Sequence, residues 1–257
     1  MVDRFEGRKV IITGAGSGIG RACVHRILQE GGTVVGLDVA EDGLKQTAEQ
    51  SAHAGQEQRL RTVVLDISDE TQVQHGVGEA VRGLGGLDVL VNAAGILRSA
   101  HTHEMTLDLW NRLIAVNLTG TFLVTRAALP ALIECGRGVV INFSSTSASF
   151  AHPYMAAYAA TKGGIQSFTH AIASEYSKKG MRAVAVAPGS IQSDMTTGRG
   201  PGLPADADMS LFIKLAPAIG EGMAGPDKVA SVVAMLASDD GAFITGTEVR
   251  IDGGTHY

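Results

Sequence analysis

Short apolar runs alternate along the chain with longer segments in which apolar residues recur at helical spacing. The runs are continuously hydrophobic, as is typical of strands buried on both faces of a sheet. The predicted strands are Lys9–Thr13, Thr33–Leu37, Arg61–Leu65, Leu87–Val91, Gly138–Asn142, Met181–Val186 and Thr247–Ile251. Helices are expected near 19–30, 41–53, 70–82, 107–135, 227–236 and, around Tyr158, up to about residue 178. This alternation predicts an α/β fold with a doubly wound, seven-stranded parallel sheet and helices on both faces.

No linker or change in composition divides the 257 residues, so residues 1–257 are expected to form a single domain. The stretch at about 190–225 is the exception to the alternation, because it is rich in glycine and proline and has only scattered apolar residues. Long loops in compact domains are usually functional or disordered. We expect this stretch to be a lid over a substrate site, with a short helix in it.

A glycine-rich segment joins the first predicted strand to the first predicted helix. It reads Thr13-Gly14-x-x-x-Gly18-x-Gly20, with Gly16 inside it. Glycines at such a turn let the backbone approach a pyrophosphate, and the unpaired N–H groups of the helix start attract its charge. The segment therefore predicts a dinucleotide site in a Rossmann-type fold.

Two acidic residues stand at the ends of the next two strands. Asp38 ends the second strand, where a carboxylate can accept hydrogen bonds from both ribose hydroxyls of a dinucleotide. The same carboxylate would repel a 2′-phosphate, so the sequence predicts NAD(H) rather than NADP(H). Capping of the following helix is the alternative role, although Glu41 or Asp42 could also serve there. Asp66 ends the third strand and is expected to accept from the adenine amino group.

The segment Ala148–Phe168 carries Tyr158 and Lys162, four residues apart in a predicted helix. Residues at this spacing lie on one helix face. A nearby ammonium favours a phenolate, so Lys162 is expected to lower the pKa of Tyr158 into a useful range for proton transfer. The hydroxyl cluster Phe143-Ser144-Ser145-Thr146-Ser147 precedes this helix. Taken alone, the pair would fit a surface helix with a lysine that extends to solvent.

Several motifs occur in a fixed order along the chain: Thr13-Gly14-x-x-x-Gly18-x-Gly20, Asp66, Asn92-Ala93-Ala94-Gly95, Asn117, Ser145, Tyr158-x-x-x-Lys162, Pro188-Gly189 and Asp252-Gly253-Gly254. Together they resemble the short-chain dehydrogenase/reductase superfamily in its single-domain branch, over essentially the whole chain. Two positions depart from the family pattern. Ala93 stands where a second Asn is usual, and Ser193 stands where a threonine often contacts the nicotinamide amide. The Ala93 turn is mostly structural, and the Ser193 hydroxyl is expected to suffice.

The resemblance implies a role for each motif residue. Tyr158 would be the general acid/base, Lys162 would lower its pKa and hold the nicotinamide ribose, and Ser145 would hydrogen-bond the substrate oxygen. Asn117 would fix a helix irregularity and a water that relays protons to Lys162. No metal is needed. The expected cofactor-binding residues are Gly14, Ser17, Gly18, Ile19, Asp38, Asp66, Ile67, Asn92, Ala93, Gly95, Tyr158, Lys162, Pro188, Gly189, Ile191 and Ser193.

Composition narrows the possible partners and compartment. The formal net charge of −5, with no basic stripe, argues against nucleic acid. Cys23 and Cys135 match no metal or redox spacing, and His101 and His103 have no third ligand in the pattern. No apolar run approaches the roughly 18 residues of a membrane span, and no signal-peptide pattern is present, so a cytoplasmic protein is expected. The resemblance implies a homotetramer, with Trp110 and the stripe 122–132 as core or subunit contacts.

The sequence thus predicts an NAD(H)-dependent oxidoreductase that interconverts a secondary alcohol and a ketone. The apolar lid and the lack of clustered basic residues near it favour a neutral, apolar substrate. His152, between Ser145 and Tyr158, either contacts substrate or is exposed to solvent. A 3-oxoacyl-carrier-protein reductase is the alternative within the family, although those reductases generally use NADPH. A non-catalytic NAD(H)-binding sensor is the alternative of a different class, but such proteins typically lose the Tyr or the Lys.

Overall fold

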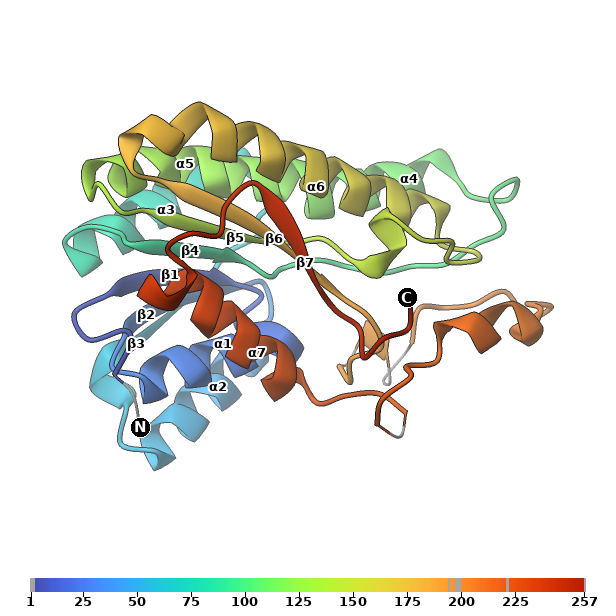
Figure 1. The fold of residues 1–257 in the computed structure, drawn as a ribbon, viewed down its shortest axis with the longest axis horizontal. Coiled ribbons are helices and arrows are strands. Elements are labelled where there is room, and N and C mark those ends of the chain that lie inside the picture. Colours follow the sequence, from blue (N-terminus) through green and yellow to red (C-terminus); the bar gives the residue numbers. More distant parts are fainter. Residues whose placement is uncertain (1–2, 194, 197–199, 221, 257) are drawn as a thin grey trace.

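The computed structural model describes residues 3–193, 195–196, 200–220 and 222–256. Its strands form one parallel sheet in the order β3-β2-β1-β4-β5-β6-β7 (Figure 1). The strands are β1 Lys9–Thr13, β2 Thr33–Asp38, β3 Leu60–Val64, β4 Val89–Asn92, β5 Val139–Phe143, β6 Arg182–Pro188 and β7 Thr247–Ile251. The predicted fold class is confirmed, and the strand ends differ from the predicted ends by at most two residues.

Helices cover both faces of the sheet, in the two layers visible in Figure 1. One layer holds α1 Gly18–Gln29, α2 Glu41–His53 and α7 Pro226–Ala237. The other holds α3 Glu70–Leu84, α4 Leu107–Leu113, α5 Gly120–Glu134 and α6 Ala156–Tyr176. Successive side chains of a strand point to opposite faces. Val10 and Ile12 of β1 therefore enter one core, whereas Ile11 enters the other.

The sheet reverses its direction of winding between β1 and β4, which are hydrogen-bonded neighbours. In a doubly wound sheet, the loops after the two strands at such a point diverge to opposite faces and leave a crevice at the carboxyl ends of the strands. The glycine-rich segment follows β1, and the segment Ala93-Ala94-Gly95 follows β4. The fold therefore places these two predicted motifs side by side.

The predicted long helix at 107–135 contains a break in its regular pattern. Between α4 and α5, the segment Ile114–Thr119 is a single stretch of π-helix, and Asn117 lies inside it. The combined helical region Leu107–Glu134 is long and apolar enough to cross a membrane by length and composition alone, with 44% of its most apolar window buried in the protein. Core helices pass the same test, and α5 packs here against α3 and the sheet. We draw no membrane role from it.

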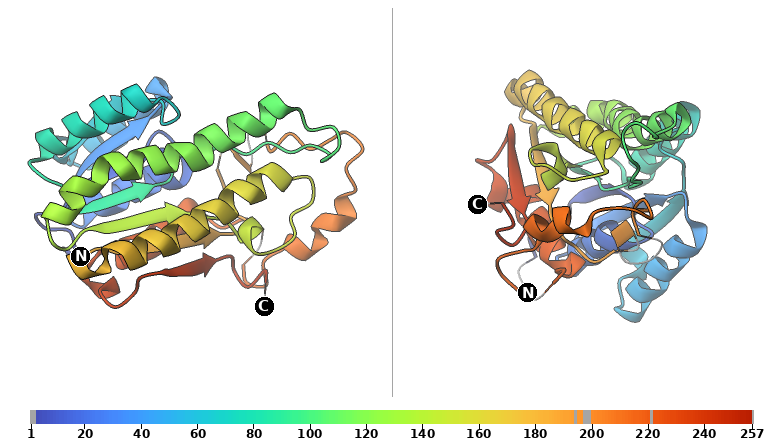
Figure 2. Two further views of the ribbon diagram at one scale, coloured as in Figure 1. Left: turned by 90° about the horizontal axis from the view of Figure 1, so that it is seen from above. Right: turned by 90° about the vertical axis from the view of Figure 1, so that its right-hand side faces the viewer.

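The predicted lid lies beyond the carboxyl ends of the strands, next to the loops that precede α4 and α6 (Figure 2). It carries the short 3₁₀ helix η6, Met209–Leu215. The Tyr154 hydroxyl accepts a hydrogen bond from the Asp208 backbone at 2.8 Å, and His101 pairs with Asp206 at 2.9 Å. Residues 194, 197–199 and 221 of the predicted lid lie outside the described residues.

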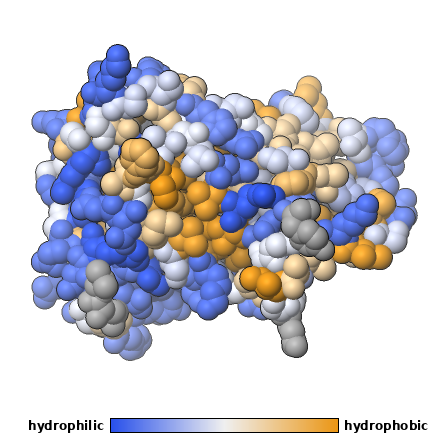
Figure 3. Space-filling model, viewed as in Figure 1, coloured by the Kyte–Doolittle hydropathy of each residue, from blue (hydrophilic) through white to orange (hydrophobic). Residues whose placement is uncertain are grey.

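Apolar side chains also gather on an outer face of the molecule, over β7 and α7 (Figure 3). Phe243, just before β7, is fully exposed, and Met235 of α7, Ile244 and Val249 of β7 are partly exposed. β7 is an edge strand of the sheet. A second exposed apolar group lies on α4 and α5, where Trp110 and Phe122 are 37% and 41% exposed.

Candidate active site

A cavity of about 790 Å³ lies at the carboxyl ends of the strands. Its lining comes from the segments that follow β1, β2, β3, β4, β5 and β6, together with α6, the predicted lid and the segment after β7. Almost all of the sequence-predicted cofactor residues line it: Gly14, Ser17, Gly18, Ile19, Asp38, Asp66, Ile67, Ala93, Gly95, Tyr158, Lys162, Pro188, Gly189, Ile191 and Ser193.

The glycine-rich segment packs so closely on itself and on the segment after β4 that two of its glycines have no space for a side chain. Gly14 has φ +71°, and a Cβ there would lie 2.8 Å from the Ala94 backbone nitrogen. A Cβ on Gly20 would lie 2.0 Å from the Gly14 carbonyl oxygen. The start of α1, at Ser17 and Gly18, consequently faces the cavity. At a helix start, backbone N–H groups without a partner inside the helix can bind the oxygens of a pyrophosphate.

Asp38 is fixed at the end of β2 by the backbone. Its Oδ2 accepts a hydrogen bond from Gly16 N at 2.9 Å, and its Oδ1 accepts one from Ala40 N at 2.9 Å. A Cβ on Gly16 would lie 3.0 Å from the Asp38 carboxylate, so a larger residue at position 16 would crowd that carboxylate. The α2 helix begins after Ala40 without a side-chain cap. The carboxylate thus stays on the cavity wall, where it could accept hydrogen bonds from ribose hydroxyls.

Asn92 is the predicted cofactor residue that does not line the cavity. It is 3% exposed, and its Nδ2 donates to Thr125 Oγ1 at 2.9 Å and to Asn142 Oδ1 at 2.8 Å. The side chain therefore faces the core between β5 and α5. Ala93, Ala94 and Gly95 carry the chain past the cavity, and Ala94 N donates to Thr13 Oγ1 at 3.1 Å. The alternation of side chains along β4 explains why Asn92 points away.

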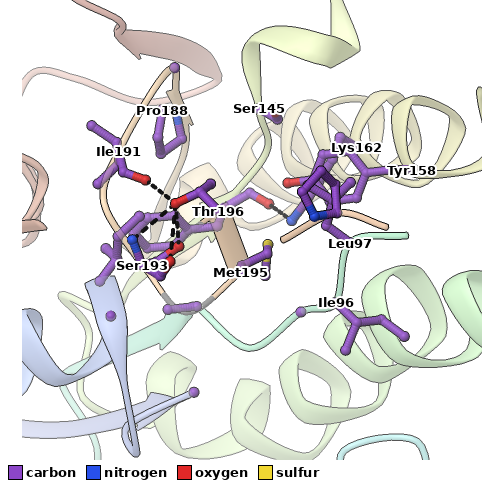
Figure 4. Close-up of a pocket in the computed structure, with 18 of the residues that line it drawn as sticks. Ile96, Leu97, Ser145, Tyr158, Lys162, Pro188, Ile191, Ser193, Met195 and Thr196 are labelled. Atoms are coloured by element: carbon purple, nitrogen blue, oxygen red, sulfur yellow. Dashed lines mark hydrogen bonds between the residues drawn. The ribbon is translucent and has the colours of Figure 1, made fainter. Parts of the chain in front are cut away.

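Three of the four predicted catalytic residues, Ser145, Tyr158 and Lys162, meet on one wall of the cavity (Figure 4). β5 delivers Ser145, and α6 presents Tyr158 and Lys162 one turn apart. Lys162 is 5% exposed, and its Nζ donates to the Phe143 carbonyl at 2.7 Å and lies 5.5 Å from the Tyr158 ring centroid. In Figure 4, Met195 and Thr196 face this pair across the cavity.

The expectation that Lys162 lowers the pKa of Tyr158 does not hold in this structure. Burial raises the pKa of Tyr158 to about 12, and a hydrogen bond with Ser145 offsets the rise only in part. Burial also lowers the pKa of Lys162 to about 8. The ammonium is directed at the Phe143 carbonyl, so it stabilises the phenolate less than the low-polarity surroundings destabilise it.

Asn117 lies behind the cavity and not in its lining. It is fully buried, accepts from Ile96 N at 2.8 Å, and donates to Ile96 O at 2.9 Å and to Thr161 Oγ1 at 3.2 Å. These bonds join the π-helical turn to the segment after β4 and to α6. The predicted helix irregularity at Asn117 is thus present, and it connects two elements that carry cavity residues.

The cavity also contains residues that sequence reasoning did not assign. Thr196, Phe212, Leu215, Thr255 and His256 line it, as does Arg112 at the exposed rim. His152, for which the sequence allows either substrate contact or exposure to solvent, belongs to the lining. For Thr255 and His256 the available signal was their position directly after the Asp252-Gly253-Gly254 motif. Nothing in the spacing of η6 indicated which of its apolar residues would face inward.

Comparison with known proteins agrees with this geometry. The model of the short chain dehydrogenase family matches residues 8–203. The chain belongs to the short-chain dehydrogenase family. Two curated members cover nearly all of it. A 3-oxoacyl-[acyl-carrier-protein] reductase from Thermotoga maritima is 36% identical, over 98% of both chains. The meso-2,3-butanediol dehydrogenase of Serratia marcescens is 34% identical, over 98% of this chain and 95% of its own.

Solved structures of short-chain dehydrogenases have the same fold. One from Mycobacterium paratuberculosis, bound to NAD, matches with a TM-score of 0.90 and 29% identity, covering 98% of each chain. One from Burkholderia cenocepacia, in complex with NADP, matches with a TM-score of 0.86 and 28% identity, covering 98% of this chain and 99% of its own. This short-chain dehydrogenase is an oxidoreductase that transfers hydride between a nicotinamide cofactor and a secondary alcohol or ketone.

Proposed function

We propose that this enzyme uses NAD(H) rather than NADP(H), and that it interconverts an uncharged, largely apolar secondary alcohol and its ketone. The cofactor choice rests on Asp38, whose carboxylate is held at the end of β2 by Gly16 and Ala40. A carboxylate there favours ribose hydroxyls and repels a 2′-phosphate. The enzyme is proposed to act in the cytoplasm.

The proposed substrate class rests on the lining of the cavity near Tyr158. Apolar side chains dominate it: Leu97, Met155, Met195, Leu203, Phe212, Leu215 and Met223. Apart from Asp38, Asp66 and Lys162, the only Asp, Glu, Lys or Arg among the described lining residues is Arg112, which is exposed at the rim. Such a wall offers little to compensate a charged substrate for lost hydration.

In the proposed mechanism, the Tyr158 hydroxyl gives a proton to the substrate oxygen during ketone reduction and takes it back during alcohol oxidation. Ser145 hydrogen-bonds the same oxygen as charge develops on it. Lys162 would hold the nicotinamide ribose, and Asn117 would order the proton path to Lys162. A bound nicotinamide would supply or accept the hydride.

The proposed assembly is a homotetramer. Two exposed apolar groups support it, one over β7 and α7 around Phe243 (Figure 3) and one at Trp110 and Phe122. The rings of Phe122 and Phe168 form an edge-to-face pair across α5 and α6, with centroids 6.3 Å apart. Exposed apolar patches of this kind commonly mark contacts between protein surfaces.

A 3-oxoacyl-carrier-protein reductase is the second candidate, favoured by the 36% identity to the Thermotoga maritima reductase. Asp38 is the feature that separates the two, because those reductases generally use NADPH. The NAD(H)-binding sensor remains the alternative of another class. It is disfavoured because Asn117, Ser145, Tyr158 and Lys162 are all retained.

The test is a fluorescence titration of the wild type and of Asp38→Ala with NADH and NADPH. We expect the wild type to bind NADH at least about tenfold more tightly, and the variant to lose most of this preference, because one charge repulsion near a phosphate amounts to about 1–2 kcal/mol. Asp42→Ala, an exposed acid on α2, is the matched control. An unchanged preference in Asp38→Ala would contradict the cofactor assignment, and wild-type turnover of acetoacetyl thioesters with NADPH would favour the reductase.

A further inference from the structure

One polar cluster interrupts the apolar wall of the cavity beside the catalytic residues. It consists of His152 and Thr146 from the segment between β5 and α6, and of Thr255 and His256 from the segment after β7. We call these four residues the histidine cluster. Thr146 directly follows Ser145, so the cluster lies close to the predicted position of the reacting oxygen.

His152 presents an uncharged imidazole with a nitrogen to spare. Its Nε2 lies 3.2 Å from Thr146 Oγ1, the one hydrogen-bond partner of His152 within the described part of the chain. Burial, reinforced by the nearby His256, lowers the pKa of His152 to about 4. At neutral pH the ring is therefore neutral, and a neutral imidazole can both donate and accept a hydrogen bond. Its Nδ1 is not among the buried, partnerless polar atoms of the described residues, so this atom has accessible surface, and His152 belongs to the cavity lining.

His256 is held against His152 by a stack of aromatic and charged groups. The ring of His256 stacks on Phe150, with centroids 4.0 Å apart and planes 14° apart, and its centroid lies 5.8 Å from that of His152. Its Nδ1 is 3.3 Å from Asp252 Oδ2. The Arg250 guanidinium lies 5.2 Å from the Phe150 centroid and donates to the His256 carbonyl at 2.7 Å. These contacts fix the segment after β7 as one wall of the cavity.

We propose that the histidine cluster is a subsite for a second, uncharged oxygen of the substrate, with His152 as the contacting residue and His256 as a positioning residue. The substrate is then a diol, a hydroxyketone or a diketone, with its second oxygen a few bonds from the reacting carbon. This inference rests on the proposed alcohol or ketone chemistry of the same cavity.

The energetics favour this occupant over the alternatives. A polar atom facing an apolar ligand loses its hydrogen bond to water without replacement, which disfavours a simple hydrocarbon chain at this position. A carboxylate would gain little from the cluster, since His152 is neutral and the Asp252 carboxylate already lies 3.3 Å from His256 Nδ1. A substrate hydroxyl can hydrogen-bond the free nitrogen of His152 in either tautomer, and a carbonyl oxygen can accept from it when that nitrogen carries the proton.

The experiment compares kcat/KM for cyclohexanol with kcat/KM for the 1,2- and 1,4-cyclohexanediols, in the wild type and four variants. We expect the wild type to prefer the better diol by at least about tenfold, because a site that hydrogen-bonds a hydroxyl rejects the analogue that lacks it. His152→Leu should lose about ten- to a hundredfold on the diol and change less than about twofold on cyclohexanol.

The other three variants separate a contact from a structural effect. His152→Gln keeps a donor and an acceptor and should retain most of the diol preference. Phe150→Leu removes the stack that positions His256 and should lower the diol preference by a smaller factor. His103→Leu alters an exposed histidine outside the cavity lining and should change neither value. The Tm and NADH affinity of each variant show whether the fold and the cofactor site are intact.

An equal loss of kcat/KM on the diol and on cyclohexanol in His152→Leu would overturn the subsite. A wild type that prefers cyclohexanol would also overturn it. Neither result would contradict the alcohol oxidoreductase activity. A wild type that binds NADH but oxidises none of the three alcohols would contradict the proposed substrate chemistry itself. A selective loss in His152→Leu, restored in His152→Gln, would establish the subsite.

Discussion

Burial is the largest influence on the catalytic pair. It raises the pKa of Tyr158 to about 12 and lowers the pKa of Lys162 to about 8. Both groups are thereby pushed toward their uncharged forms. A neutral phenol is ready to protonate a developing alkoxide, whereas alcohol oxidation requires the phenolate.

This asymmetry predicts different pH dependences for the two directions of the reaction. Below the pKa of Tyr158 the phenolate fraction grows about tenfold per pH unit, so kcat/KM for alcohol oxidation should rise steeply from pH 6 to pH 9. Ketone reduction, which uses the protonated phenol, should change little over the same range. Initial rates in both directions at constant ionic strength provide the measurement, and an oxidation rate that is flat over these three pH units would contradict the assignment.

At the scale of single elements, the π-helical turn Ile114–Thr119 connects two parts of the site. Through Asn117 it bonds both backbone groups of Ile96 and the Thr161 hydroxyl. A regular helix over the same residues would present its side chains at other angles. The turn is therefore the element that ties α6, with Tyr158 and Lys162, to the segment after β4.

Substituting Asn117→Ala should affect stability and turnover together. It leaves the N–H and carbonyl of Ile96 without their partner, which costs about 1–3 kcal/mol and lowers Tm by several degrees. kcat should fall at least about tenfold while NADH affinity changes little, because Asn117 does not line the cavity. Thr119→Ala, at an exposed position in the same turn, is the control. An Asn117→Ala enzyme with normal Tm and kcat would show that the turn has no such role.

Most elements followed from the sequence because each strand was a continuous apolar run with residues that stop it at its ends. The strand Lys9–Thr13 and the helix after it were bounded by glycines, and the strand Thr247–Ile251 was located without error. The motif residues Asp38, Ser145, Tyr158 and Lys162 were brought to one cavity as predicted. Asp38 and Ser145 stand at or just after strands that end at one edge of the parallel sheet, and this shared carboxyl edge brings them to the same cavity.

Three features of the site could not be predicted from the sequence, because they depend on side-chain direction, on burial or on contacts between distant segments. The inward turn of Asn92 toward Thr125 depends on the pleat of β4. The rise in the pKa of Tyr158 depends on how completely the surrounding protein excludes water. The place of His256 in the cavity depends on its stack with Phe150, more than a hundred residues away.

At the scale of the whole molecule, a buried ion network joins the N-terminal segment to α1. Glu30 is 4% exposed and pairs with Arg4 at 2.7 Å and with Arg26. Arg4 also reaches Asp240, after α7. Burial alone would raise the pKa of the Glu30 carboxyl, but the hydrogen bonds from Arg4 and Arg26 hold it below its usual value.

The ion network predicts that Glu30→Gln is less stable than the wild type by an amount that depends on pH. Since the folded-state pKa of Glu30 is depressed, its contribution is fully present above the unfolded pKa and is lost as the pH falls through the folded value. Glu30→Gln should therefore lower the free energy of unfolding by about 2 kcal/mol at pH 7, and by progressively less below about pH 4.5. Urea unfolding at several pH values measures this, with Glu49→Gln, on the exposed side of α2, as the control. If the stability difference between Glu30→Gln and the wild type grew as the pH fell, the result would contradict this prediction.

The most direct test of the central claim, that Tyr158 transfers the proton in an NAD-linked alcohol oxidation, is the turnover of Tyr158→Phe with its NADH affinity measured in parallel. The substitution removes one hydroxyl and keeps the ring against Lys162. We predict a loss in kcat of about a thousandfold or more, with NADH binding within about threefold of the wild type. Turnover close to that of the wild type, at unchanged cofactor affinity, would contradict the account.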